Sequence, residues 1–229
     1  MEINKEISIL QILKESLRSL KNKEILIATM TFVLVGKAIS TLYGSSYNFT
    51  IKKLIFYASG EFIIFIGEMI IIKIVDKKYK KEKVDIKNII QELIPRSFSA
   101  LALYLVVSII AILGTLALVI PGILFCVYSA FYLQVFILEN NGIEDSIENS
   151  INFSKGFRNF IFQIFIISII MTLINDEALL RLLKHLFNSS ISSGVNIIIS
   201  SAIDSFITIS FTTLYFKIKK IKTIEQVSK

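Results

Sequence analysis

The chain has 229 residues, of which 54% are hydrophobic and 19% charged, and its formal net charge is +7. Adding the glycines raises the apolar share to about 58%, above the 45–50% that is typical of soluble domains. This composition excludes disordered and disulfide-framework proteins, and it predicts a protein whose solvent is largely a lipid bilayer. Lysine and isoleucine are abundant while only four arginines occur, a bias typical of an AT-rich bacterial genome.

The N-terminal segment predicts an amphipathic helix over about residues 3–21. Its apolar residues recur at spacings of three and four, with lysines and glutamates on the other face. Such a helix either lies in the cytoplasmic headgroup layer or packs on the cytoplasmic loops. The segment has no apolar core and no small-residue cleavage site, so we do not expect a cleavable signal peptide.

Six apolar blocks follow, and charge clusters bound them. The predicted spans are residues 25–43, 54–75, 97–120, 122–138, 160–174 and 195–216. The third and fourth spans share one apolar run, which we divide at Pro121-Gly122 because a helix does not continue smoothly through that pair. The fifth span is short, but most of the blocks are long enough to cross about 30 Å of hydrocarbon. The sequence therefore predicts an all-α, polytopic membrane protein with a single integral membrane domain, residues 1–229.

Two connections also have the pattern of surface helices. Residues 142–156 place Glu144 and Asp145 in an early turn and end with Gly156, as an amphipathic helix prefers. Residues 178–187 place basic groups late, which predicts a short helix in the plane of the outer surface.

The distribution of Lys and Arg predicts the orientation. Nineteen of the 25 lie in the N-terminal segment, the second and fourth connections and the C-terminal tail, whereas the alternate connections hold four. Because cytoplasmic loops carry the excess of basic residues, both termini are predicted to be cytoplasmic. We expect the protein in a bacterial inner, or cytoplasmic, membrane.

The fourth span and the connection after it carry a group of residues in a characteristic order. They are Pro121, Gly122, Tyr128, Tyr132, Glu139, Gly142, Ser146, Ser150 and Gly156. The order resembles the membrane domain of membrane-anchored glycerophosphodiester phosphodiesterases and of related, mostly uncharacterised bacterial six-span proteins. In those enzymes catalysis belongs to a separate soluble domain with metal-binding histidine and carboxylates.

This chain has one histidine, His185, and ends at Lys229, so the resemblance does not transfer phosphodiesterase activity. Cys126 is the single cysteine, which excludes an intramolecular disulfide and a Cys/His metal site. No phosphate-binding loop, dinucleotide motif or nucleophile elbow occurs. We therefore expect no catalytic residues, no metal and no cofactor.

Apart from Lys73, near the end of the second span, four charged residues fall inside the predicted spans: Lys37, Glu61, Glu68 and Asp204. Each costs about 2.5–3.5 kcal/mol or more at a span centre and needs a partner or a task. Lys37 and Glu61 lie at similar depths, about 9–10 Å below the outer ends of neighbouring antiparallel spans, which predicts an ion pair between them. Glu68 follows Glu61 by seven residues and shares its face.

The sixth span carries a polar stripe beside Asp204. Its members are Ser201, Ser205, Thr208 and Thr212. One interpretation is a passage for a proton, a cation or a cationic substrate, lined by Asp204, Glu61 and Glu68. The other is packing, in which small hydroxyl residues let helices approach and form hydrogen bonds between them.

A lysine cluster directly follows the second span. Its members are Lys77, Lys78, Lys80, Lys81, Lys83 and Lys87. The cluster either attracts anionic lipid or is the ordinary signal that orients a membrane protein. The basic residues are dispersed among the membrane flanks, so we expect no nucleic-acid partner.

These observations support two hypotheses of different classes. The first is a membrane scaffold, transport accessory or stress-tolerance factor without catalytic activity, with a transporter or another membrane protein as its partner. The second is a small transporter that uses Glu61, Glu68 and Asp204. A lipid-handling enzyme is the weakest reading because a catalytic constellation is missing.

Overall fold

The computed structural model describes residues 7–44 and 50–227, and every regular element in this part of the chain is a helix. Six helical segments are long and apolar enough to cross a membrane. They are Lys23–Leu42, Ile51–Tyr79, Ile86–Ala117, Val119–Leu138, Arg158–Leu186 and Ser189–Gln226. The predicted fold class, an all-α protein with six candidate spans, is confirmed.

Several spans are built from more than one helical element. The elements are α1 (Ile9–Leu20), α2 (Lys23–Ala28), η2 (Thr29–Val33), α3 (Leu34–Gly44), α4 (Ile51–Tyr79), α5 (Ile86–Leu93), η3 (Ile94–Arg96), α6 (Ser97–Ala117), α7 (Val119–Tyr128), α8 (Tyr132–Leu138), α9 (Ile143–Ser154), α10 (Arg158–Leu173), η4 (Ile174–Leu179), α11 (Leu180–Leu186) and α12 (Ser189–Val227). Elements η2 and η4 are π-helical turns, which let a helix continue while it changes its winding.

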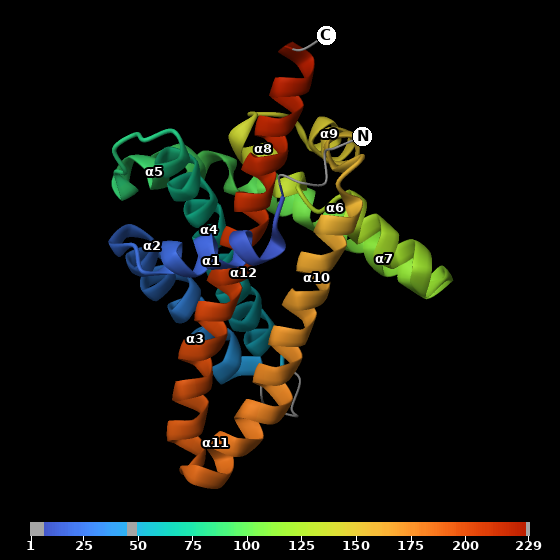
Figure 1. The fold of residues 1–229 in the computed structure, drawn as a ribbon. Helices are drawn as coiled ribbons and strands as arrows, with labels where there is room; N and C mark the ends of the chain where they lie inside the picture. Colours follow the sequence, from blue (N-terminus) through green and yellow to red (C-terminus); the bar gives the residue numbers. More distant parts are fainter. Residues whose placement is uncertain (1–6, 45–49, 228–229) are drawn as a thin grey trace.

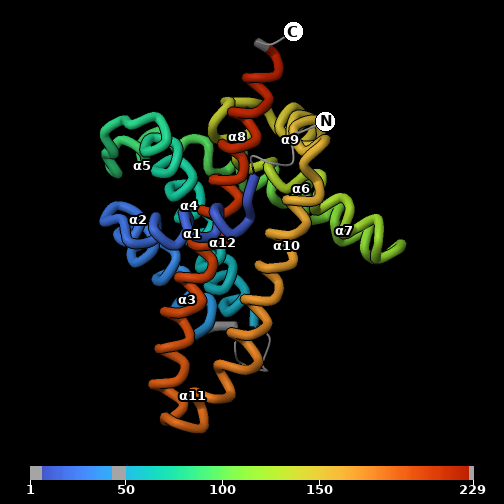
Figure 2. Tube along the Cα trace, viewed as in Figure 1, coloured from blue at the N-terminus to red at the C-terminus, as the bar shows by residue number. Residues whose placement is uncertain are grey.

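Helix α12 is the central element (Figure 1). Helices α3 and α4 pack against each other and against α12, and α10 packs on α12 as well. The ribbon and the tube both place α5, α8, α9 and the C-terminal end of α12 at one end of the molecule and α11 at the other (Figures 1 and 2). At 39 residues, α12 measures about 58 Å, far more than the 30 Å of hydrocarbon that a span must cross.

The core consists of two clusters. One is built around the isoleucines of α4, with residues of α2, α5, α6 and α8 against it. The other joins α1, α8, α10 and the C-terminal half of α12, and Tyr215 and Phe131 are its largest fully buried side chains. The half of the α6–α7 hairpin around its turn contributes no buried residue to either cluster, and its apolar side chains are exposed. In Figure 1 the labelled α7 extends away from the other helices.

Helix α1 confirms the amphipathic N-terminal element within the described residues, although the first part of the predicted range lies outside them. Ser8 caps the helix by accepting a hydrogen bond from the amide of Gln11 at 3.4 Å. Ile12 and Ser16 are buried against the protein, while Leu10 and Leu17 are 61% and 54% exposed. The helix therefore has a second apolar face that no described part of the protein covers.

The turn between the third and fourth spans lies at Leu118 rather than at the predicted Pro121-Gly122. Leu118 is extended, with φ −158° and ψ 130°, and α7 begins at the next residue. Pro121 therefore sits in the first turn of α7, where its missing N–H leaves no hydrogen bond unmade. A Cβ on Gly122 would lie 2.6 Å from the amide nitrogen of Thr115, so this glycine permits the close packing of α6 on α7.

The fifth span also differs from the prediction. We expected it to end at residue 174 and to be followed by a separate in-plane helix over 178–187. Instead α10 continues through the π turn η4 into α11 and ends at Leu186. The ion pair between Arg181 and Glu177, at 2.5 Å, links η4 to α11 along this continuous helix.

Candidate functional site

The described structure places an ion pair inside the membrane-spanning region. The ammonium of Lys37 on α3 lies 2.5 Å from a carboxylate oxygen of Asp204 on α12. The two side chains are 29% and 22% exposed. The predicted pairing of Lys37 with Glu61 is therefore wrong, because the turn of α3 presents its lysine to α12 and not to α4.

The remaining intramembrane acids lie near this pair, on α4. Glu68 is half-buried, and its carboxyl group is within electrostatic range of Asp204, Lys37 and Glu61. Glu61 is exposed at the surface of the helix. The structure thus brings together the four ionisable residues that the sequence singled out, with three acids against one base.

The hydroxyl stripe of α12 is largely satisfied within the protein. Ser201, Thr208 and Thr212 donate to the carbonyls four residues earlier, at 2.7, 3.0 and 2.7 Å. Ser205 accepts a hydrogen bond of 2.9 Å from Thr29 on the π turn η2. Ser201, Ser205 and Thr212 are buried. These contacts match the packing interpretation, because most of these hydroxyls point at their own helix and one joins two helices.

Two glycines, Gly36 and Gly60, bring α3 and α4 into close contact next to the Lys37–Asp204 pair. A Cβ on Gly60 of α4 would lie 2.7 Å from the carbonyl oxygen of Gly36, and a Cβ on Gly36 would lie 2.6 Å from the carbonyl oxygen of Gly60. The backbones of α3 and α4 therefore touch one residue away from Lys37 and Glu61. Sequence analysis missed this contact, although small residues on two neighbouring spans are its signal.

A second candidate site lies where the fourth span breaks, and it includes Ser150 of the group that the sequence singled out. The chain interrupts its helix between α7 and α8, and α9 supplies the missing hydrogen-bond partners. Ser150 accepts from the amide of Phe131 at 3.0 Å, and Ser154 donates to the carbonyl of Tyr128 at 3.1 Å. Gly156 then ends the helical region at a φ of +84°, a conformation that favours glycine.

The other members of this group have local roles. Ser146 is buried and donates to the carbonyl of Gly142 at 2.5 Å. Ser154, which the sequence analysis did not single out, follows Ser146 and Ser150 at the same spacing of four residues. One buried face of α9 is thus made of three serines, and the helix packs on α7 and α8 through it.

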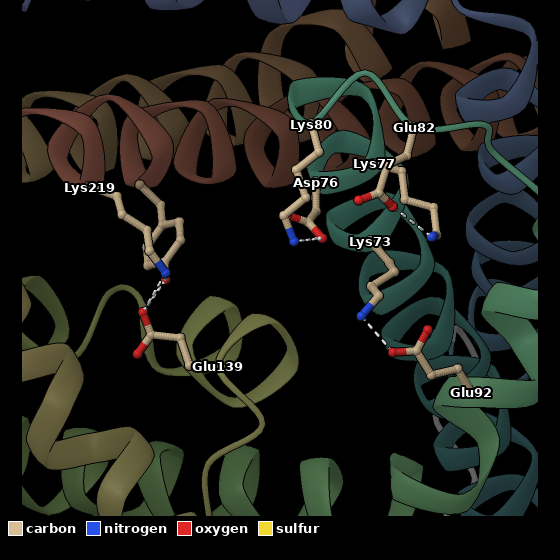
Figure 3. A network of polar contacts seen from close by, with 9 residues as sticks. Lys73, Asp76, Lys77, Lys80, Glu82, Glu92, Glu139 and Lys219 are labelled. Atoms are coloured by element: carbon tan, nitrogen blue, oxygen red, sulfur yellow. Dashed lines mark hydrogen bonds and ion pairs between the residues drawn. The ribbon is translucent and has the colours of Figure 1, made fainter. Parts of the chain in front are cut away.

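Glu139 joins this region to α12. It accepts hydrogen bonds from the hydroxyl of Tyr215 at 2.6 Å and from the ammonium of Lys219 at 2.9 Å (Figure 3). Burial alone would raise the pKa of Glu139, but the hydrogen bonds from Tyr215 and Lys219 outweigh it and hold the pKa below the usual value of 4.5. Glu139 is therefore a charged link between the end of α8 and α12.

Three of the six lysines in the cluster after the second span are paired with acids. Lys77 lies 3.1 Å from Glu82 and Lys80 lies 2.9 Å from Asp76 (Figure 3), while Lys78 lies 2.7 Å from Glu24. Lys73, one turn earlier, pairs with Glu92 at 2.5 Å (Figure 3). Lys81 and Lys83 are exposed. Part of the cluster's charge is thus neutralised within the protein. Lys78 joins α4 to α2, and Lys73 outside the cluster joins α4 to α5.

Residues with metal-ligating or nucleophilic side chains are scattered. Among the described residues, no group of three or more His, Cys, Asp and Glu side chains could hold a metal ion. Cys126 is a free thiol, half-buried in α7. His185 is exposed in the last turn of α11. Neither residue lies with the intramembrane acids in a candidate site.

Comparison with known proteins identifies no relative: no protein-family model, curated protein or solved structure matches this chain. The site must therefore be interpreted from its own geometry. That geometry consists of the Lys37–Asp204 ion pair between α3 and α12, the half-buried Glu68 beside it, and the hydroxyls of α12, which form hydrogen bonds within the protein.

Proposed function

We propose that this multi-pass membrane protein is a scaffold, transport accessory or stress-tolerance factor without catalytic activity of its own. The observation that carries the proposal is the ion pair of Lys37 and Asp204, together with the satisfied hydroxyls of α12. A charge that is neutralised by its neighbour holds helices together and needs no transported ion. The partner in this proposal is a transporter or another membrane protein.

The proposal includes a location and a relationship. We infer a bacterial cytoplasmic membrane with both termini in the cytoplasm, supported by the 19 basic residues on one set of connections. The helical break between α7 and α8, filled by Ser150 and Ser154, supports a relationship to the membrane domain of glycerophosphodiester phosphodiesterases. The family's soluble catalytic domain is not part of the proposal.

A second function is favoured by Glu68. Glu68 is half-buried, with Asp204 and Glu61 in electrostatic range, so this site holds three acids against the single base Lys37. A carboxyl group of that kind is a candidate for proton or cation binding along a transport path. The two functions differ in whether Glu68 carries a moving ion.

Proton flux into vesicles distinguishes them. We expect the purified protein, reconstituted in phosphatidylcholine and phosphatidylglycerol vesicles with an internal pH dye, to give the same flux as protein-free vesicles. Glu68→Gln should then change nothing, and neither should the matched control Glu82→Gln, an acid in the exposed loop after α4. A flux that requires Glu68 but tolerates Glu82→Gln would establish the transporter instead, and a potassium or sodium gradient extends the test to cations.

A further inference from the structure

A cavity of about 720 Å³ lies where α1 crosses α4 and α12. Three helices end or pass there, and α1 lies over α12 at this level (Figure 1). Four basic side chains line the cavity together with one acid, Glu15. The basic residues are Arg18, Lys78, Lys217 and Lys220. The cavity therefore carries an excess of positive charge.

Two of the four basic side chains are already paired with acids of the protein. Lys217 lies 3.0 Å from Glu15, which fastens α1 to α12, and Lys78 lies 2.7 Å from Glu24. Within the part of the chain that the structure describes, no acid lies within ion-pair distance of Arg18 or Lys220. Both side chains are exposed, so an incoming anion can reach them.

The cavity is lined by apolar as well as charged side chains. Along α4, Val75 lies about 4.5 Å before Lys78, and along α12, Phe216 lies about 6 Å before Lys220. Both helices run from the spanning region towards the same end of the molecule. Val75 and Phe216 therefore lie on the membrane side of Lys78 and Lys220, whereas Ile221 directly follows Lys220.

The surrounding surface also fits the membrane interface. Tyr79 stacks on Phe216 at a ring distance of 4.5 Å, and aromatic side chains of this kind gather at headgroup level. The apolar face of α1, with Leu10 and Leu17, is not covered by any described residue. A helix that lies in the interface would bury that face in lipid.

We propose that this cavity binds the phosphate-bearing headgroup of an anionic phospholipid, with Arg18 and Lys220 as the residues that contact it. Arginine and lysine both pair with phosphate, and basic pockets beside membrane helices recognise anionic headgroups in this way. The site shares Lys78 with the lysine cluster that follows the second span, but Arg18 and Lys220 lie outside that cluster. The bound lipid would lock α1 onto α4 and α12.

The test measures binding of phosphatidylglycerol that carries a fluorescent acyl chain to the full chain in uncharged detergent. We expect saturable binding, with the same probe on a phosphatidylcholine headgroup much weaker. The variant Arg18→Gln/Lys220→Gln should bind phosphatidylglycerol at least tenfold more weakly, or about 1.4 kcal/mol. Lys83→Gln/Lys87→Gln, the loop variant, removes the same charge from exposed positions in the loop after α4 and in the first turn of α5, and it should bind like the wild type.

Further variants and competitors distinguish a specific lipid site from a general effect of charge. Arg18→Lys/Lys220→Arg keeps both charges and should retain binding, and the wild type alone must already prefer phosphatidylglycerol to phosphatidylcholine. Equal loss in the loop variant would reduce the effect to general charge and overturn the site. Inorganic phosphate and glycerol 3-phosphate are tested as competitors. If either displaces the lipid probe as well as unlabelled phosphatidylglycerol does, the cavity binds soluble phosphate and the proposed lipid site is wrong.

Discussion

Asp204 and Lys37 form a contact whose two halves depend on each other. A charge left without its partner in a bilayer-spanning helix is costly, whereas a matched neutral pair is not. The pair joins α3 to α12, elements that lie far apart in the sequence. The contribution of this pair to the free energy of unfolding is therefore best measured by removing one charge and then both.

We expect Asp204→Asn to lower the free energy of unfolding by about 2 kcal/mol, because it strands the ammonium of Lys37. Adding Lys37→Met should recover most of that loss. The measurement is thermal or denaturant unfolding in detergent micelles. Glu61→Gln, which neutralises an exposed acid of the same region, serves as the control and should have little effect; additive losses in the double variant would contradict the pairing.

Glu139 gives a contact that depends on pH. Its pKa is lowered in the folded protein, so its carboxylate contributes stability above the usual pKa of 4.5, and this contribution is lost as the pH falls through the lower, folded value. We expect Glu139→Gln to destabilise the protein at neutral pH by about 1–2 kcal/mol, as for hydrogen bonds to a charged group. The difference from the wild type should shrink in acid.

Unfolding of both proteins at neutral pH and below pH 4 provides that measurement. Tyr215→Phe removes one donor and leaves Lys219 in place, so it should lose part of the same stability. A difference between wild type and Glu139→Gln that grows towards acid would show that the carboxyl is protonated in the folded protein.

At the scale of elements, the packing of α3 on α4 depends on the absence of side chains. Gly36 and Gly60 face each other so closely that either Cβ would collide with backbone. Backbone cannot give way as a flexible side chain can, so the helices would have to separate. Overpacking of this kind costs about 1–3 kcal/mol.

We therefore expect Gly60→Ala to destabilise the protein by about 1–3 kcal/mol and to weaken the contact of Lys37 with Asp204. Gly194→Ala is the matched control, because no atom lies within 4 Å of its Cβ and alanine favours the helix. Unfolding in micelles compares the two variants. Equal stability of both would mean that α3 and α4 approach less closely than these glycines allow.

The α9 element shows how one helix completes another. Its buried serines supply an acceptor and a donor at the break between α7 and α8, where the backbone groups of Phe131 and Tyr128 have left the helical pattern. A polar helix thus packs against an apolar span without leaving these groups unpaired. Pattern analysis singled out Ser146 and Ser150 but not Ser154, and the pattern alone did not explain what these serines do.

At the scale of the whole molecule, the two described ends of the chain lie together. Helix α1 packs on the C-terminal half of α12 through Lys217 and Glu15, so both belong to one side of the spans. Helix α11 lies at the opposite end (Figures 1 and 2). We propose that the side with α1 and the end of α12 is cytoplasmic, because most basic residues lie on the connections of that side, and labelling tests this.

We expect a thiol introduced by Gln226→Cys to react with a membrane-impermeant reagent only after the cells are permeabilised, and one introduced by Lys184→Cys to react in intact cells. Both variants are made with Cys126→Ser, which removes the natural thiol. The two positions are exposed and lie at opposite ends of the molecule. Reversed labelling would invert the orientation, and labelling of both in intact cells would contradict a membrane crossing by α12.

The sequence by itself determined that this protein is a bundle of six apolar helices, because hydropathy and helix formation are sums over neighbouring residues. It also identified the four intramembrane charges, since each stands out against an apolar background. Tertiary structure decided their partners: Lys37 meets Asp204, 167 residues away, because the rotation and neighbours of α3 select that contact. The tertiary structure also decided that the chain turns at Leu118 and that α10 runs through a π turn into α11. The local sequence pattern allows a helix to end at several positions, and packing between helices selects one of them.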